Sequence, residues 1–125
     1  MMKLKRMAVF LIIALLVISS PVFAIDTVST FKLMNQQNEL VLSKEVSFQE
    51  GETLYDVTKK AFEIEESQGH IISINGIRSI PEKNIHWAAF VNGHFVQLSL
   101  DEVTLYANDE IVWALRDWNR LDILK

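Results

Sequence analysis

The segment from Ile85 to Leu98 limits the fold most, because it holds an Asn-Gly pair between two apolar runs. Asn92-Gly93 in this setting is the strongest short-range signal for a β-hairpin. A two-residue turn there pairs Phe90 with Phe95 and sets the register of the hairpin. Because side chains alternate along a strand, one face carries Trp87, Ala89, Val91, Val96 and Leu98. We expect that face to be part of the core. The opposite face carries His86, Ala88, Phe90, Phe95 and Gln97.

This opposite face places two aromatic rings across from each other among polar neighbours. Two interpretations stay open. The remaining strands or the chain termini cover the face, since exposed aromatic pairs are uncommon on monomers. Alternatively, the rings form a platform for a large flat ligand or a partner protein. Under the second interpretation, Phe90 and Phe95 are candidate ligand-binding residues.

Strands and turns dominate the rest of the chain. Residues 30–34 and 40–48 have strand-like patterns on either side of the polar break at 35–38, which predicts another hairpin. Residues 70–125 are expected to be strand and turn throughout, with a final strand at 111–115.

One helix is predicted, over residues 53–67. Thr53 and Asp56 have the spacing of a capping box. Apolar residues follow at positions 54, 57, 61 and 64 and form a single stripe, with Gly69 as the expected terminator. A hairpin, one helix and returning strands predict an α+β fold of the β-grasp type, with the helix packed on a mixed sheet.

The N-terminal 24 residues have the organisation of a secretory signal peptide. Lys3, Lys5 and Arg6 precede an apolar run over residues 7–18, and small residues lead to a cleavage site after Ala24. The run is shorter than the ~20 residues that a membrane span needs, although an uncleaved N-terminal anchor is the alternative. The expected mature domain is residues 25–125, secreted to the periplasm or the extracellular space, with no stable membrane span after cleavage.

Charge and composition exclude several kinds of function. The whole chain has 12 basic and 16 acidic side chains, and the mature part would lose three of the basic ones. This acidic balance disfavours nucleic acid as a partner. The chain has no Cys, so thiolate metal sites and Cys nucleophiles are excluded. His70, His86 and His94 have no metal-site spacing, and no Gly-rich loop opens the helix. We expect no metal, no bound cofactor and no enzymatic activity.

Several motifs resemble those of a known family. They are residues 51–57 (Gly-Glu-Thr-Leu-Tyr-Asp-Val), 73–77 (Ser-Ile-Asn-Gly-Ile), 86–93 (His-Trp-Ala-Ala-Phe-Val-Asn-Gly), 103–106 (Val-Thr-Leu-Tyr) and 108–113 (Asn-Asp-Glu-Ile-Val-Trp). Together they are similar to the C-terminal domain of transcobalamin and intrinsic factor, and to related secreted bacterial and archaeal domains. His86 stands where the family usually has an aromatic residue, and Asn108 where it has Gly. Asn75, Gly76 and Gly93 are expected to serve the fold, because tight turns need such residues.

The resemblance implies a β-grasp-like fold and a part in closing over cobalamin, which a separate helical barrel domain mainly holds in the animal carriers. On that basis Phe90, Phe95 and Trp87 are the candidate contacts. The prediction is a secreted, non-enzymatic binding module for cobalamin, another corrinoid or another large ligand, acting with a helical-barrel or envelope protein. The alternative is a structural or interaction module of the cell envelope, which binds a protein or glycan by its sheet edge.

Overall fold

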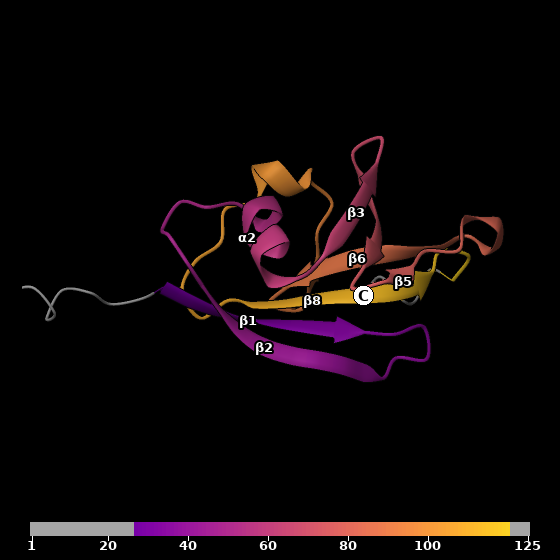
Figure 1. Cartoon of the computed structure of the whole chain (residues 1–125), viewed down its shortest axis with the longest axis horizontal. Helices are drawn as coiled ribbons and strands as arrows, with labels where there is room; N and C mark the ends of the chain where they lie inside the picture. The colour runs from indigo at the N-terminus through magenta and orange to yellow at the C-terminus, as the bar shows by residue number, and fades with distance from the viewer. Residues whose placement is uncertain (1–26, 121–125) are drawn as a thin grey trace, which may run out of the picture.

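A five-stranded mixed sheet forms the base of the molecule (Figure 1). The computed structural model describes residues 27–120, so the predicted signal peptide lies outside the described residues. The strand order is β2-β1-β8-β6-β7. The strands are β1 Thr27–Met34, β2 Leu40–Phe48, β6 Ile85–Val91, β7 His94–Phe95 and β8 Glu110–Asp117. The β1 and β8 strands are parallel, and the other neighbours are antiparallel.

A second layer covers one face of this sheet. It consists of helix α2 (Leu54–Ala61) and a small sheet of β3 (Ile64–Ser67), β4 (His70–Ile74) and β5 (Ile77–Arg78). Two short 3-10 turns, η1 (Pro81–Lys83) and η2 (Leu100–Glu102), complete the described elements. Figure 1 shows α2 and β3 on the same side of the large sheet. The predicted α+β fold with one helix packed on a mixed sheet is confirmed.

The core lies between α2 and the large sheet. Alternation along β1 and β8 directs Phe31, Leu33 and Ile111 toward Leu54 and Val57 of the helix, and all five are fully buried. One polar pair crosses this layer: the indole Nε1 of Trp113 donates to Thr58 Oγ1 at 3.1 Å. Burial of a Trp nitrogen requires such a partner, so this bond fixes how α2 is oriented on β8.

The capping box at the start of α2 is confirmed. Thr53 Oγ1 accepts from the Asp56 N–H at 3.2 Å, and Asp56 Oδ2 accepts from the Thr53 N–H at 3.2 Å.

The predicted end of the helix is wrong. The helix stops at Ala61, and residues 64–67, expected to be helical, form β3. Phe62 is already extended at φ −139°. Gln68 and Gly69 both have positive φ and make the two-residue turn of the β3–β4 hairpin, so Gly69 does not terminate the helix.

The hairpin at Asn92-Gly93 is confirmed, but it is shorter than expected. Phe90 pairs with Phe95 and Val91 with His94, and β7 ends there. The chain then departs toward η2, and Leu98, expected in the core, is 62% exposed. The assignment of Leu98 was wrong because alternation applies only while a strand continues.

The two Asn-Gly turns are anchored by their asparagine side chains, in addition to their positive φ angles. Asn75 Oδ1 accepts the N–H of Glu63 at 2.9 Å, which joins the β4–β5 turn to the end of α2. Asn92 Oδ1 accepts the N–H of Glu110 at 2.8 Å, and its amide donates to Asp109 at 2.9 Å. Both motifs therefore serve the fold, as predicted.

Candidate functional site

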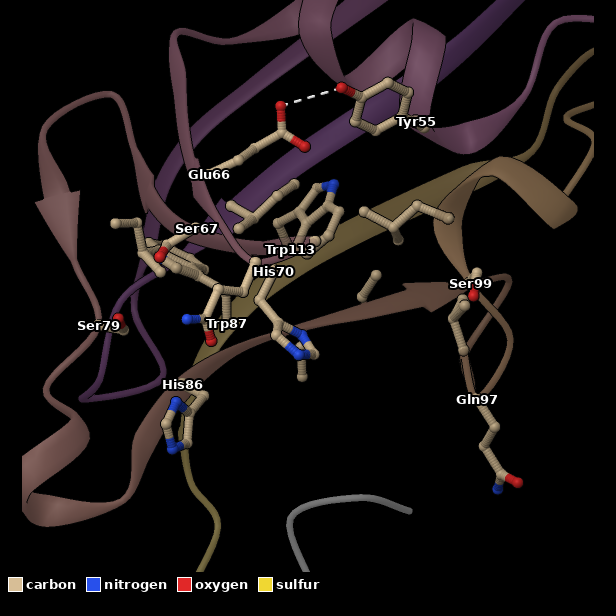
Figure 2. A pocket seen from close by; sticks show the side chains of 18 of the residues that line it. Tyr55, Glu66, Ser67, His70, Ser79, His86, Trp87, Gln97, Ser99 and Trp113 are labelled. Atoms are coloured by element: carbon tan, nitrogen blue, oxygen red, sulfur yellow. Dashed lines mark hydrogen bonds between the residues drawn. The ribbon is translucent and has the colours of Figure 1, made fainter.

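An open groove of about 1110 Å³ is lined by residues from both layers of the fold, and Figure 2 shows it from close by. Its walls come from α2, the β3–β4 hairpin, the start of β6 and the loop that follows β7. The residues that line it include Tyr55, Glu66, His70, Ile72, Ser79, His86, Trp87, Ala88, Ala89, Phe95, Val96, Gln97, Leu98, Ser99, Asp101, Trp113 and Trp118.

One end of the groove is formed by a contact between α2 and β3. The Tyr55 hydroxyl donates to Glu66 Oε2 at 2.9 Å, as Figure 2 shows. The Lys59 ammonium lies 4.4 Å from the centre of the Tyr55 ring, on the same helix. The hydrogen bond therefore joins β3 to α2 at this end of the groove.

The inner wall is made by two tryptophans whose polar atoms already have partners. Trp87 Nε1 donates to the Ile77 carbonyl at 3.0 Å, and Trp113 Nε1 is bonded to Thr58. Trp87 is 6% exposed and belongs to the core face of β6, as predicted. Both indoles therefore present fixed apolar surface to the groove, and neither has a free donor for a ligand.

A chain of aromatic rings lies on the opposite face of β6, and we call it the outer aromatic cluster. It consists of His86, Trp118, Phe95 and Phe90. The ring centroids are 6.0 Å apart for His86 and Trp118, 5.7 Å for Trp118 and Phe95, and 5.7 Å for Phe95 and Phe90. These separations are typical of favourable aromatic pairs.

The members of the cluster differ in exposure. Phe90 is only 8% exposed, because Ala88, Ala114, Met34 and Val112 pack around it. The neighbouring strands therefore cover this ring, which agrees with the first of the two interpretations left open above. Phe95 is half-buried and Trp118 is 36% exposed, and both line the groove. Ligand contact by Phe90, Phe95 and Trp87 stays a prediction, with Phe95 the best placed of the three.

Trp118 was missed by the sequence reasoning. Its main-chain N–H donates to the Asn84 carbonyl at 2.9 Å, which continues the antiparallel pairing of β8 with β6 by one residue beyond Asp117 and Ile85. The sequence pattern ends the final strand at residue 115, whereas β8 continues to Asp117, and an aromatic residue directly after that strand was the signal available.

The charge of the groove has one sign. Glu66 and Asp101 line it, and its lining contains neither Lys nor Arg. His70 and His86 are the remaining titratable nitrogens. Such a surface favours a neutral or cationic ligand over an anion.

The groups with displaced pKa values lie away from the groove. The hydrogen bond from Lys60 lowers the pKa of Glu52, and the Thr53 backbone bond lowers the pKa of Asp56. Burial lowers the pKa of Arg116, whose guanidinium donates to Asn38 Oδ1 at 2.7 Å. All three perturbations arise from structural contacts.

Within residues 27–120, no three His, Asp or Glu side chains come together in a way that could hold a metal ion. The same part of the chain contains no helix of the length and hydropathy needed to cross a membrane.

These features define a small α+β domain with a groove at the edge of its sheet. The chain belongs to a family described as a domain of unknown function (DUF4430), whose model matches residues 51–117, more than half of the chain. That match contains α2, the small sheet and every wall of the groove except Trp118. A search of curated proteins finds no match.

Two solved structures are similar in fold. One is a candidate metal-binding protein from Ruminococcus gnavus ATCC 29149, with 14% identity and a TM-score of 0.57, covering 73% of this chain and 97% of that one. The other is haptocorrin in complex with Cbi, with 19% identity and a TM-score of 0.53, covering 75% of this chain but only 27% of that one. Haptocorrin is a protein of the transcobalamin family, so the resemblance predicted from the motifs is confirmed at the level of fold.

Proposed function

We propose that this protein is a non-catalytic binding module whose ligand lies in the groove. The groove itself carries this proposal. Its volume of about 1110 Å³ exceeds the roughly 300–1,000 Å³ of common small-molecule sites, which supports a large ligand. Its walls combine apolar indole surface with carboxylates at Glu66 and Asp101, a composition suited to binding. The displaced pKa values arise from structural contacts outside the groove, so they give no support to general acid–base catalysis there.

A corrinoid is the ligand that we propose to test first. The support is the similarity in fold to haptocorrin, whose structure is a complex with Cbi. Phe95 and Trp87 are the proposed contacts among the residues predicted from the sequence, and Trp118 and Tyr55 join them from the structure. Phe90 is proposed to support the ring of Phe95, which packs against it, and not to contact the ligand.

A partner protein is the second part of this proposal. The similarity covers 27% of haptocorrin, so most of that protein has no counterpart in this chain. An open groove leaves much of a large ligand in water, whereas a tight site buries about 70–90% of it. A partner such as a helical-barrel or envelope protein would supply the other wall. We also propose that residues 1–24 direct the chain out of the cytoplasm and that residues 25–125 act in the periplasm or outside the cell.

Titration of the purified protein with cobalamin and with cobinamide tests the ligand. We expect micromolar binding by calorimetry, together with a change in the visible absorbance of the corrinoid. Leu98→Ala is a suitable probe, because Leu98 lines the groove and is 62% exposed, so its loss costs little stability. We expect it to weaken binding by about fivefold, in keeping with removal of one apolar contact.

The matched control is Tyr106→Ala. Tyr106 is 64% exposed and lies outside the groove lining, so its loss should leave binding unchanged. Equal weakening by both variants would place the ligand elsewhere, and no binding of either corrinoid would refute a corrinoid as the ligand of this module.

A further inference from the structure

The backbone of β6 has a gap in its pairing that faces the groove. On one side, β6 is paired with β8 over its whole length. On the other side it is paired only near its ends. Ile80 and Ile85 exchange both of their main-chain hydrogen bonds, at 2.8 and 3.1 Å, and the Val96 N–H donates to the Ala89 carbonyl at 2.9 Å. Trp87 lies midway between these two pairings.

The direction of the Trp87 main-chain groups follows from strand geometry. In antiparallel pairing, a residue directs its N–H and its C=O to the same neighbour, and the next residue directs both to the other side. Ile85 and Ala89 bond away from β8, so Trp87 does the same, while His86 and Ala88 bond toward β8. Within residues 27–120, no turn, loop or side-chain hydrogen bond reaches the main-chain N–H or C=O of Trp87.

These two groups belong to a residue of which little is exposed to water. Trp87 is only 6% exposed, and an unpaired main-chain group in such a setting costs free energy. A ligand that supplies both an acceptor and a donor would relieve that cost. The span from Ile85 to Ala89 is four residues, about 13 Å of strand, and it accommodates about three residues of a neighbouring strand.

We propose that an extended segment of a partner protein adds to the sheet at Trp87, as a short strand within the groove. The occupant is a polypeptide, so this inference goes beyond the proposed function and stands whether or not a corrinoid binds. The groove supports this occupant, because its lining includes Trp87, Ala88 and Ala89 of β6 together with Gln97 and Leu98 of the loop after β7.

The faces of β6 set the preferred sequence of the added segment. The residue opposite Trp87 has its side chain on the face of β6 that carries α2, the face to which the acidic Glu66 and Asp101 belong, so a Lys or Arg fits there. The residues on either side of it have their side chains on the face of the outer aromatic cluster, near Phe95 and Trp118, so apolar residues fit there. The expected sequence of the added segment is therefore apolar–basic–apolar.

A blocked pentapeptide, acetyl-Thr-Val-Lys-Val-Thr-amide, tests the proposal against the isotope-labelled protein. Backbone amide signals are followed by NMR up to about 1 mM peptide, a concentration that detects even weak binding. We expect saturable shifts that are largest at the Trp87 and Ala89 amides. The same peptide with an N-methylated lysine lacks the central donor, and we expect it to bind about tenfold more weakly, the effect of one lost hydrogen bond. Shifts confined to the free edge of β2, or none at all, would overturn the proposal, as would equal binding of the methylated peptide.

Charge reversal tests the side-chain preference. Asp101→Lys reverses the charge of an exposed groove residue and leaves the Tyr55–Glu66 hydrogen bond in place, so the fold should persist, and we expect the lysine peptide to bind about fivefold more weakly. A peptide with Glu in place of Lys should bind this variant more tightly than the lysine peptide does. The control is Glu45→Lys, an exposed residue on β2 outside the groove lining, which should have no effect. Equal effects of the control and the groove variant would show that only net charge matters and would refute the assigned site. Addition of cobinamide to the bound peptide reports whether the two ligands compete, and it does not bear on pairing at Trp87.

Discussion

Phe90 tests whether the outer aromatic cluster is packed structure or an accessible surface. Its ring is 8% exposed, and two of its neighbours, Ala88 and Ala114, have no side-chain atoms beyond Cβ. They cannot move into the space that Phe90→Ala would open, so a cavity should remain. Replacement of a buried Phe by Ala costs about 3–5 kcal/mol, and the position of Phe90 on the outer face of the sheet favours the lower end, about 3 kcal/mol.

That cost is a large fraction of the roughly 5–15 kcal/mol by which a domain of this size is stable. It corresponds to a fall in Tm of about 12–24 °C, at 4–8 °C per kcal/mol. Thermal unfolding followed by circular dichroism, together with urea titration, measures both quantities. The control is Tyr106→Ala, on a side chain that is 64% exposed, which should change stability by less than about 0.5 kcal/mol.

Phe95→Ala distinguishes the structural role of Phe90 from the proposed ligand-binding role of Phe95, its cross-strand partner. Phe95 is half-buried, so its loss should cost about 1–2 kcal/mol of stability. The protein should stay folded, and its groove should bind ligand more weakly. Because the two rings touch, the double variant should be less destabilised than the sum of the single ones, by about 0.5–1.5 kcal/mol. A cost below about 1 kcal/mol for Phe90→Ala would show that the ring is not packed, and the account of this face would be wrong.

Four other predictions concern the fold. Thr53→Ala removes the capping box of α2 and should cost about 1 kcal/mol in urea titration, whereas Thr53→Ser should retain most of it. Asn92→Ala loses a residue suited to φ +51° and two side-chain hydrogen bonds, so we expect a loss of about 2 kcal/mol by the same assay. The lowered pKa values of Glu52 and Asp56 contribute stability that is present above the unfolded values of 4.5 and 3.8 and is lost as the pH falls through the lower folded values. The urea midpoint should therefore decline below about pH 4.5, and Asp56→Asn should reduce that decline. Finally, EDTA should leave the Tm unchanged; a fall would show a metal site that the described residues do not reveal.

The turns were predictable from the sequence because their requirements are local. Asn75 and Asn92 tolerate positive φ, each is followed by Gly, and each lies between apolar runs. The start of α2 was equally predictable, since Thr53 and Asp56 each accept the other's main-chain N–H within one helical turn. In these cases the residues of the turn or of the helix start set the backbone conformation themselves, although the Asn75 and Asn92 side chains then bond to residues more distant in the sequence.

The end of the helix was not predictable in this way. Ile64 continues the apolar stripe of α2, but it is the first residue of β3, whose other three residues are polar and exposed. The choice is made by pairing with β4, in which Ile64 faces Ile74 across the Gln68-Gly69 turn. Helical periodicity does not contain that information, because it depends on pairing with the strand that follows the turn.

The groove was predictable only in part. Its walls come from α2, the small sheet, β6 and the loop after β7, so no window of sequence contains them. Two of the predicted contacts, Trp87 and Phe95, line it, while Phe90 lies beneath Phe95. The exposure of Leu98 follows from the shortness of β7, which the Asn-Gly pair does not determine.

The parallel pairing of β1 with β8 has a consequence for how the chain folds. Thr30 pairs with Glu110, 80 residues later, at the centre of the large sheet. The strand nearest the N-terminus therefore cannot take its final place until the last strand has been made. Closing so long a loop is entropically costly, and proteins rich in such pairings fold slowly. The protein should refold from urea in one cooperative step on a timescale of milliseconds to seconds, and a chain shortened before residue 110 should have no stable folded half.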